Sequence, residues 1–290
     1  MGISFSKLKT QRAREPPSPK NTVILFSLNN TLFDHHHSMT CGLRAAFTMY
    51  PHLEIRTHKT FPELAMMYDH CLNIAYNRYL RNAYSNTYSN ANANSYTQKD
   101  DLNIRLFFQF LRLPPPTQCE IKEFRERYRE AYRESRRAVV GALETLRRLG
   151  ESGVRMAVVT NGVGEVEREK AVAIGVAELV ECVVVSEEVG VSKPDGSGRI
   201  FEVATERMGV ERGECVCFVV GESVEADVEG ALRAGLTPVL FDPDVIVVQF
   251  KDATNLPDDV SISIVPLHVP GNPRSDRRNK ISPLKVSKKK

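Results

Sequence analysis

Short apolar runs alternate with amphipathic stretches along most of this chain, and their order predicts the fold. The run from Val23 to Phe26 is apolar at every position, which is typical of a parallel strand buried on both faces. After residue 138, further strands alternate with helices. These strands are predicted at Arg155–Thr160, Cys182–Ser186, Cys215–Val220, Thr237–Phe241 and Ile262–Val265. Repeated strand–helix units predict a parallel sheet with right-handed crossovers.

The stretch from residue 38 to 137 shows helical periodicity only. Its predicted helices cover Glu63–Tyr84, Leu102–Leu113 and Glu120–Arg137, and Thr-x-x-Glu capping boxes precede the first and the last. Because this block follows the first strand directly, we expect a helical cap over the strand ends. The predicted fold class is α/β, with a Rossmann-like parallel-sheet core (21–37 and 138–267) and an inserted all-helical cap (38–137).

Residues 82–97 break the helical pattern inside the expected cap. They are almost all Asn, Ser, Ala and Tyr. Because this composition cannot bury a core, we predict a flexible insertion between two helices, with aromatic contacts to a ligand as the alternative.

Charge is spread unevenly along the 290 residues. The formal net charge is +3, but residues 1–20 carry +4 and residues 268–290 carry +7, so the body between them carries −8. Both tails are predicted to be flexible and basic, and the last one is either a solvated tail or a nuclear targeting patch. The basic–aromatic interleaving that is typical of nucleic-acid binding is missing, so no nucleic-acid partner is expected.

Composition and the first residues bear on where the protein works. No apolar run approaches the ~18 residues that span a membrane, and the six cysteines form no Cys-x-x-Cys pair. A reduced, cytoplasmic setting is therefore predicted. The start also matches the N-myristoylation pattern, with Gly2 as acceptor and Ser6 at the preferred position. The alternatives are an ordinary flexible terminus and peripheral membrane contact through an acyl chain and nearby basic residues.

Polar residues follow the predicted strands where the strands end. They are Ser27, Asn29, Asn30 and Thr31 after the first strand, Thr160 and Asn161, Lys193, and Glu222, Ser223 and Asp227. In an open α/β sheet these loops converge at one edge, where ligands bind. Hydroxyl, amide and lysine groups together suit a phosphate, and two carboxylates on one loop suit Mg²⁺.

In this order, the motifs resemble those of the haloacid dehalogenase-like (HAD) hydrolase superfamily with a helical cap of the C1 type. Residues 26–34, 158–162, 192–195 and 220–235 resemble its four motifs, and the resemblance covers residues 21–243. It implies phosphatase or dehalogenase ancestry. It also implies roles for individual residues: Thr160, with Asn30 and Asn161, would hold a phosphoryl group, Lys193 would steady the charge, and Glu222 and Asp227 would hold Mg²⁺.

The first motif departs from the family pattern, which reads Asp-x-Asp-x-Thr. Ser27 stands in place of the nucleophilic Asp, and Asn29 in place of the Asp that acts as general acid and base. Ser27 cannot form an aspartyl-phosphate, and Asn29 cannot accept a proton as a carboxylate does. With two carboxylates gone, Mg²⁺ should bind more weakly, whereas an anionic phosphate should meet less repulsion.

Three functions remain open. The first is a catalytically impaired protein that binds a phosphorylated small molecule or a protein partner. The second is a working hydrolase in which Ser27 takes the phosphoryl group, or in which Ser27 and Asn29 position a water. The third is a membrane-tethered scaffold. Asp34 is expected to be a cap-side or N-cap residue and not a displaced nucleophile, with the three following histidines in a solvated hinge. The substrate and the oligomeric state cannot be read from the sequence.

Overall fold

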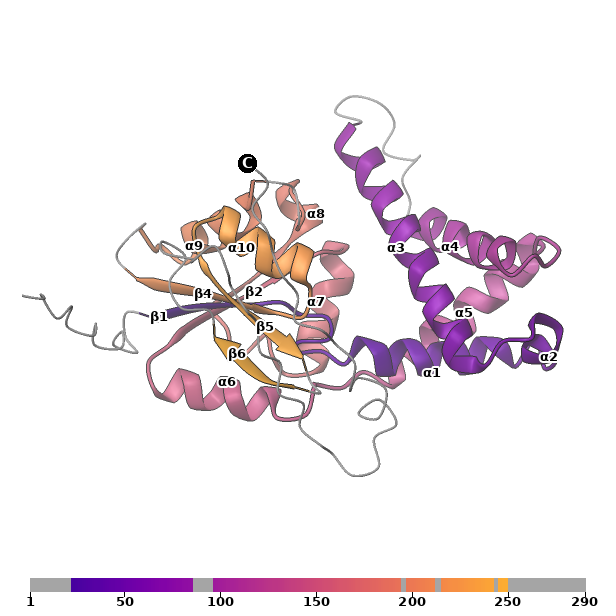
Figure 1. The fold of residues 1–290 in the computed structure, drawn as a ribbon, viewed down its shortest axis with the longest axis horizontal. Helices are drawn as coiled ribbons and strands as arrows, with labels where there is room; N and C mark the ends of the chain where they lie inside the picture. Colours follow the sequence, from indigo (N-terminus) through magenta and orange to yellow (C-terminus); the bar gives the residue numbers. More distant parts are fainter. Residues whose placement is uncertain (1–21, 86–95, 194–196, 212–214, 243–244, 250–290) are drawn as a thin grey trace, which may run out of the picture.

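The computed structural model describes residues 22–85, 96–193, 197–211, 215–242 and 245–249 (Figure 1). A sheet with helices on both faces forms one part of the molecule, and a group of helices extends from one end of it. The predictions for residues 1–20, for the strand at 262–265 and for the tail at 268–290 lie outside the described residues.

The sheet has the strand order β3-β2-β1-β4-β5-β6. Its strands are β1 (Thr22–Phe26), β2 (Arg155–Thr160), β3 (Cys182–Val185), β4 (Val216–Gly221), β5 (Thr237–Asp242) and β6 (Val245–Gln249). Strands β1 to β5 pair in parallel, which confirms the predicted sheet. Strand β6 was not predicted, and it adds an antiparallel edge strand beside β5. Antiparallel edge strands are common on otherwise parallel sheets.

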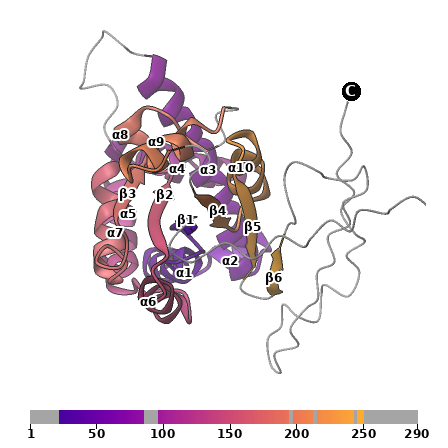
Figure 2. The same cartoon turned by 90° about the vertical axis from the view of Figure 1, so that its left-hand side faces the viewer.

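Strand β1 is central because its apolar residues supply both faces of the sheet. Successive side chains of a strand point to opposite faces. Val23 and Leu25 are buried against α9 (Arg199–Arg207) and α10 (Gly230–Arg233). Phe26 belongs to the cluster on the other face, with α6 (Ala142–Glu151) and α7 (Gly164–Ala173). Figure 2 shows α9 and α10 on the side of the sheet opposite α6.

The chain continues as helix directly after β3 and shortly after β4. The strand expected at Cys182–Ser186 stops at Val185, because Ser186 begins a short helix, α8 (Ser186–Val189). The segment after β4 begins as a π-helical segment, η2 (Val224–Glu229), and continues as α10. π-Helical turns are frequent at functional sites, and η2 carries Asp227.

Helices α1 to α5 follow β1 and precede α6 in the described chain, and we call these five the helical insert. They are α1 (His35–Phe47), α2 (Leu53–Thr57), α3 (Phe61–Ser85), α4 (Tyr96–Phe110) and α5 (Gln118–Glu134). Helix α5 starts at the predicted capping box, in which Thr117 and Glu120 each bond the other's backbone N–H. Helices α3 and α4 extend farther into the Asn-rich segment (82–97) than predicted. Once a helix has formed, it extends readily through residues of modest helix propensity.

Helix α1 was not predicted. Its N-cap is Asp34, whose carboxylate accepts a hydrogen bond of 3.0 Å from the N–H of His37. This confirms the N-cap prediction for Asp34. The expected solvated hinge is wrong, because His35 to His37 form the first turn of α1. Within the described residues no helix is long and apolar enough to cross a membrane.

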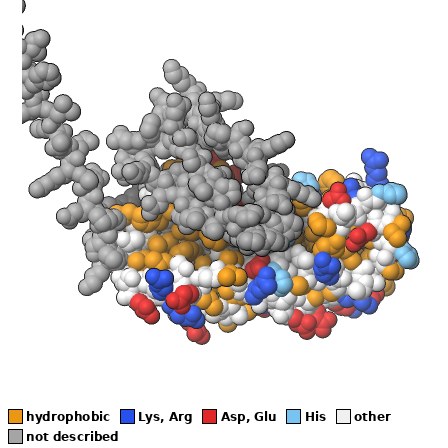
Figure 3. Space-filling model, turned by 60° about the horizontal axis from the view of Figure 1, so that its bottom comes forward, with side chains coloured by type: hydrophobic (Ala, Val, Ile, Leu, Met, Phe, Trp, Pro, Cys, Tyr) orange, Lys and Arg blue, Asp and Glu red, His pale blue; other side chains and the backbone are white. Residues whose placement is uncertain are grey.

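The surface carries charges of both signs close together. Figure 3 shows acidic and basic side chains interspersed on one face of the described molecule. Exposed pairs such as Arg127–Glu123 and Arg199–Glu206 belong to this pattern. Exposed pairs of this kind contribute little to stability.

Candidate functional site

The loop after β1 lies at the carboxyl edge of the sheet, beside the ends of β2 and β4. Phe26 pairs with Val158 and Val220, and the N–H of Ser27 donates to the carbonyl of Val220 at 2.8 Å. The three strands therefore end side by side, and the polar residues after them meet. Ligands bind at this edge of open α/β sheets.

Ser27, Lys193 and Asp227 form one buried group at this edge. The Lys193 ammonium donates to Asp227 Oδ1 at 2.7 Å and to the Ser27 hydroxyl at 3.1 Å. The Lys193 and Asp227 side chains are only 4% and 3% exposed. The N–H of Ser223 donates to the other oxygen of Asp227 at 3.1 Å. Lys193 is the donor in its bond to Ser27, so it does not serve that hydroxyl as a base.

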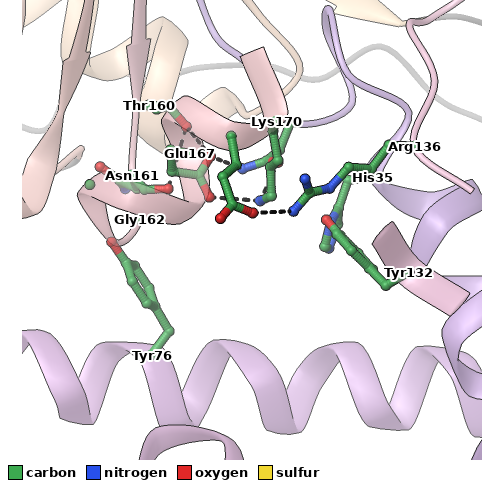
Figure 4. A network of polar contacts seen from close by, with 12 residues as sticks. His35, Tyr76, Tyr132, Arg136, Thr160, Asn161, Gly162, Glu167 and Lys170 are labelled. Carbon is green, nitrogen blue, oxygen red and sulfur yellow. Dashed lines mark hydrogen bonds and ion pairs between the residues drawn. The ribbon is translucent and has the colours of Figure 1, made fainter. Parts of the chain in front are cut away.

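Thr160 belongs to a second group of polar side chains, in which Glu167 and Lys170 lie beside it (Figure 4). The half-buried Asn29 is bonded to the same group. Glu167 Oε2 accepts hydrogen bonds from the Thr160 hydroxyl at 3.0 Å and from the Asn29 amide at 3.1 Å. Lys170 donates to Glu167 Oε1 at 2.6 Å and to the Asn29 carbonyl oxygen at 3.0 Å. The hydroxyl that the resemblance assigns to a phosphoryl group is therefore bound to a carboxylate of the same chain.

The sequence reading missed Glu167 and Lys170. Glu167 and Lys170 are three positions apart on α7, so their side chains share one face of the helix. Many ion pairs on solvent-exposed helices have the same spacing. Their side chains are nevertheless only 5% and 7% exposed, because α7 packs its first turns against the edge of the sheet. Their position in the sequence could have indicated them as site residues. Helix α7 begins four residues after Thr160, so its first turns lie next to the end of β2.

Asn161 contacts the protein backbone with both of its polar side-chain atoms. Its carbonyl oxygen accepts from the N–H of Lys193 at 2.8 Å, and its amide donates to the Lys193 carbonyl at 2.5 Å. These reciprocal bonds join the loop after β2 to the segment that carries Lys193. The side chain of Asn161 therefore positions the lysine.

Asn30 and Glu222 lie at the outer rim of the same edge. Asn30 has a left-handed φ of 55°, and its amide donates to Glu222 Oε1 at 2.8 Å. Partial desolvation, together with the nearby carboxylates of Asp227 and Asp69, raises the pKa of Glu222 above its ordinary value, and the hydrogen bond from Asn30 opposes the rise. Asp69 belongs to α3, so the helical insert approaches the rim at this point.

Two tyrosines of α3 connect the insert to the loop after β2. The Tyr76 hydroxyl lies 3.1 Å from the Ser186 hydroxyl, which accepts from the N–H of Gly162 at 3.0 Å. The Tyr79 hydroxyl donates to Glu187, which also accepts from the N–H of Gly164 at 2.8 Å. The insert thus covers the site and is tied to it by side-chain hydrogen bonds.

Comparison with known proteins identifies the family of this fold and site. The sequence profile described as haloacid dehalogenase-like hydrolase matches residues 24–241, which is most of the chain. The chain belongs to this family.

Several solved structures of the HAD family share the fold. A HAD hydrolase of Bacillus subtilis, solved with magnesium, superposes with a TM-score of 0.55 at 18% identity, over 85% of this chain and 92% of that one. A HAD family hydrolase of Deinococcus radiodurans, solved with phosphate and sodium, gives a TM-score of 0.52 at 21% identity, over 77% of this chain and 80% of that one. Identities this low support the fold alone.

Three relatives with assigned activities are phosphatases. Ribulose-1,5-bisphosphate 5-phosphatase of Halopiger xanaduensis is 36% identical over 131 residues, which is 45% of this chain and 52% of the relative. Phosphoserine phosphatase of Thermus thermophilus is 40% identical over 90 residues, 31% of this chain and 34% of the relative. N-acylneuraminate-9-phosphatase of Homo sapiens is 39% identical over 88 residues, 30% of this chain and 34% of the relative. The chain thus spans about half or less of these relatives' lengths.

HAD hydrolases generally use Mg²⁺, and the sequence predicts Glu222 and Asp227 as its ligands here. Among the described residues, no three His, Cys, Asp or Glu side chains come together as a metal site. Asp227 faces Lys193 and Glu222 faces Asn30, so the two carboxylates have separate partners. The hydroxyl of Ser27 cannot replace a third carboxylate. This donor set does not fit a strong Mg²⁺ site.

Proposed function

We propose that this chain binds a phosphorylated small molecule and has lost the covalent phosphoryl transfer of the HAD family. The environment of Ser27 carries the proposal. Its hydroxyl accepts a hydrogen bond from Lys193, and no carboxylate or imidazole among the described residues is bonded to it. Activation of a hydroxyl nucleophile needs an adjacent base. Asn29, the other departure from the motif, is held by Glu167 and Lys170 and brings no titrating group.

Retained phosphate-binding groups support the binding half of the proposal. Thr160 and Lys193 lie at the same sheet edge, with Asn30 at the rim and Asn161 behind Lys193. The three named relatives are phosphatases of small phosphorylated compounds. Binding of Mg²⁺ through Glu222 and Asp227 is proposed to be weak. A protein partner recognised by the helical insert is the alternative ligand.

Hydrolysis of p-nitrophenyl phosphate, measured beside equilibrium binding of phosphate esters, tests the proposal. The expected result is binding, with no turnover above that of Ser27→Ala. Turnover that is Mg²⁺-dependent and abolished by Asp227→Ala or Ser27→Ala would overturn it in favour of a working hydrolase. Failure of every ester to bind would favour the protein partner.

The cellular setting also stays a prediction. Residue Gly2 lies outside the described residues, as does the basic tail. Cytoplasmic location is the proposal, with membrane contact through an acylated Gly2 or nuclear entry through the tail as alternatives. Incorporation of a myristate analogue into the wild type but not into Gly2→Ala would establish the membrane contact, and an unlabelled wild type would exclude acylation.

A further inference from the structure

The buried pair of Glu167 and Lys170 is not part of the four motifs, yet it lies among them. Burying two charges carries a large desolvation penalty that only good geometry and further hydrogen bonds offset. Both conditions hold here. Lys170 bonds Glu167 at 2.6 Å and Asn29 at 3.0 Å, and its ammonium lies 5.5 Å from the centre of the Phe33 ring and 5.9 Å from that of Tyr132.

Three donors of different kinds surround the Glu167 carboxylate. They are the hydroxyl of Thr160 from the end of β2, the amide of Asn29 from the loop after β1, and the ammonium of Lys170 from α7. A hydroxyl, an amide and a cation converging on oxygen atoms are what a bound phosphate receives from a protein. The carboxylate therefore occupies a position equipped for an anion.

The loop after β2 packs tightly against this carboxylate. A Cβ atom added at Gly162 would overlap the Glu167 side chain, because the two lie in direct contact. The glycine thus lets Glu167 run beneath the loop toward Thr160. Figure 4 shows Thr160, Glu167 and Lys170 pointing toward one another from the strand end and the helix.

We propose that Thr160, Asn29 and Lys170 form an anion-binding site and that Glu167 fills it as a built-in anion. The inference rests on the proposed function, because the entering anion is taken to be a phosphate. A phosphate gains the three donors only when the carboxylate withdraws, and Lys170 then serves as its counter-ion. Glu167 thereby decides which anions the site admits.

The same arrangement accounts for Asn at position 29. An aspartate there would place a second carboxylate against Glu167, where the Asn29 amide now donates at 3.1 Å. Two like charges at this distance cannot both stay ionised without a large penalty. An amide is compatible, because its N–H₂ faces the carboxylate and its oxygen faces Lys170.

Calorimetric titration of the full chain with inorganic phosphate tests the inference. Glu167→Gln keeps the side-chain volume and removes the competing charge, so it should bind phosphate about tenfold more tightly than the wild type, or about 1.4 kcal/mol. Thr160→Val combined with Glu167→Gln is the matched control, and it should lose most of that gain because the hydroxyl donor is gone.

The outcomes separate the inference from the proposed function. If the wild type binds phosphate and Glu167→Gln binds it no more tightly, the inference fails and the proposed function stands. If only Glu167→Gln binds inorganic phosphate, the inference stands, and the binding of phosphate esters to the wild type decides the proposed function. If neither protein binds it, both fail, and if both bind it with the expected gain, both are supported.

A second variant covers the case in which Glu167→Gln does not fold, since that change leaves Lys170 without its carboxylate. Glu167→Asp keeps the charge near Lys170 but shortens the reach toward Thr160 and Asn29. We expect its phosphate affinity to lie between those of the wild type and Glu167→Gln. Phosphate should also raise its melting temperature more than that of the wild type. An affinity and a melting-temperature shift equal to those of the wild type would overturn the inference.

Discussion

The ammonium of Lys193 donates a hydrogen bond of 3.1 Å to the hydroxyl of Ser27 inside the protein. In a HAD hydrolase this lysine steadies a nucleophilic carboxylate. Here the partner is a neutral hydroxyl, and the lysine's charge is balanced by Asp227 at 2.7 Å. Lys193 and Asp227 thus stay paired beside a neutral hydroxyl, and this bears on activity, stability and metal binding.

Restoring activity should require three substitutions. Ser27→Asp with Asn29→Asp rebuilds the family motif but places a carboxylate against Glu167. Adding Glu167→Gln removes this repulsion. We therefore expect the triple variant to hydrolyse p-nitrophenyl phosphate in the presence of Mg²⁺, at a rate about tenfold or more above that of the double variant. Equal rates would show that Glu167 does not obstruct the restored motif, and inactivity of both would mean that the site has changed more widely.

Breaking the buried pair at Lys193 should destabilise the fold strongly. Lys193→Met leaves Asp227 buried without its cation, so we expect the free energy of unfolding in urea to fall by about 3–5 kcal/mol. Lys193→Met combined with Asp227→Leu should lose less than the single variant. As a control, Arg199→Ala breaks an exposed pair with Glu206 and should cost less than about 1 kcal/mol. A small loss for Lys193→Met would contradict the assigned burial.

Glu222 should make stability fall as pH rises. Its pKa is raised in the folded state, first by partial desolvation and then by Asp227 and Asp69. Above its ordinary pKa of 4.5, the folded chain therefore binds more protons at this site than the unfolded chain does. Near pH 7 the melting temperature of Glu222→Gln should be higher than that of the wild type. The difference should shrink as the pH falls toward 4.5. A constant difference from pH 4 to about pH 8 would show that the raised pKa is absent.

Mg²⁺ should stabilise the wild type little. Asp227 and Glu222 are engaged by Lys193 and Asn30, and Ser27 adds no charge. Ser27→Asp supplies a third carboxylate beside Asp227, so millimolar Mg²⁺ should raise its melting temperature more than that of the wild type. The same melting experiment with Ca²⁺ is a useful comparison, because Ca²⁺ accepts a less regular arrangement of oxygen ligands than Mg²⁺ does. A large shift for the wild type with Mg²⁺ would contradict the poor fit of its ligands.

The sequence predicted the strands well because their signal is local. Strand β2 has the predicted bounds, and β1 differs by one residue at its start, since continuous apolar runs between polar loops are typical of buried parallel strands. Strand β6 lies outside the repeating strand–helix pattern, and α8 is only one turn long, so neither gave a period to detect.

The site was harder to predict than the strands. Position after a strand located Ser27, Thr160, Lys193 and Asp227, because the carboxyl ends of parallel strands share an edge. Glu167 and Lys170 depend on which face of α7 is turned inward, and that is decided by tertiary packing, including that of α7 against β3 and α8. The spacing that makes a solvated pair on an exposed helix is the same spacing that makes a buried pair here.

The hydrogen bonds of Tyr76 and Tyr79 give the helical insert a mechanical role. Their partners, Ser186 and Glu187, are the groups that satisfy the N–H donors of Gly162 and Gly164. Tyr76 and Ser186 are 110 positions apart in the chain, so this link acts as a tether between distant segments. A displacement of α3 would reach the backbone of Gly162 through the side chains of Tyr76 and Ser186. The helical insert is therefore coupled by hydrogen bonds to the loop that follows Thr160.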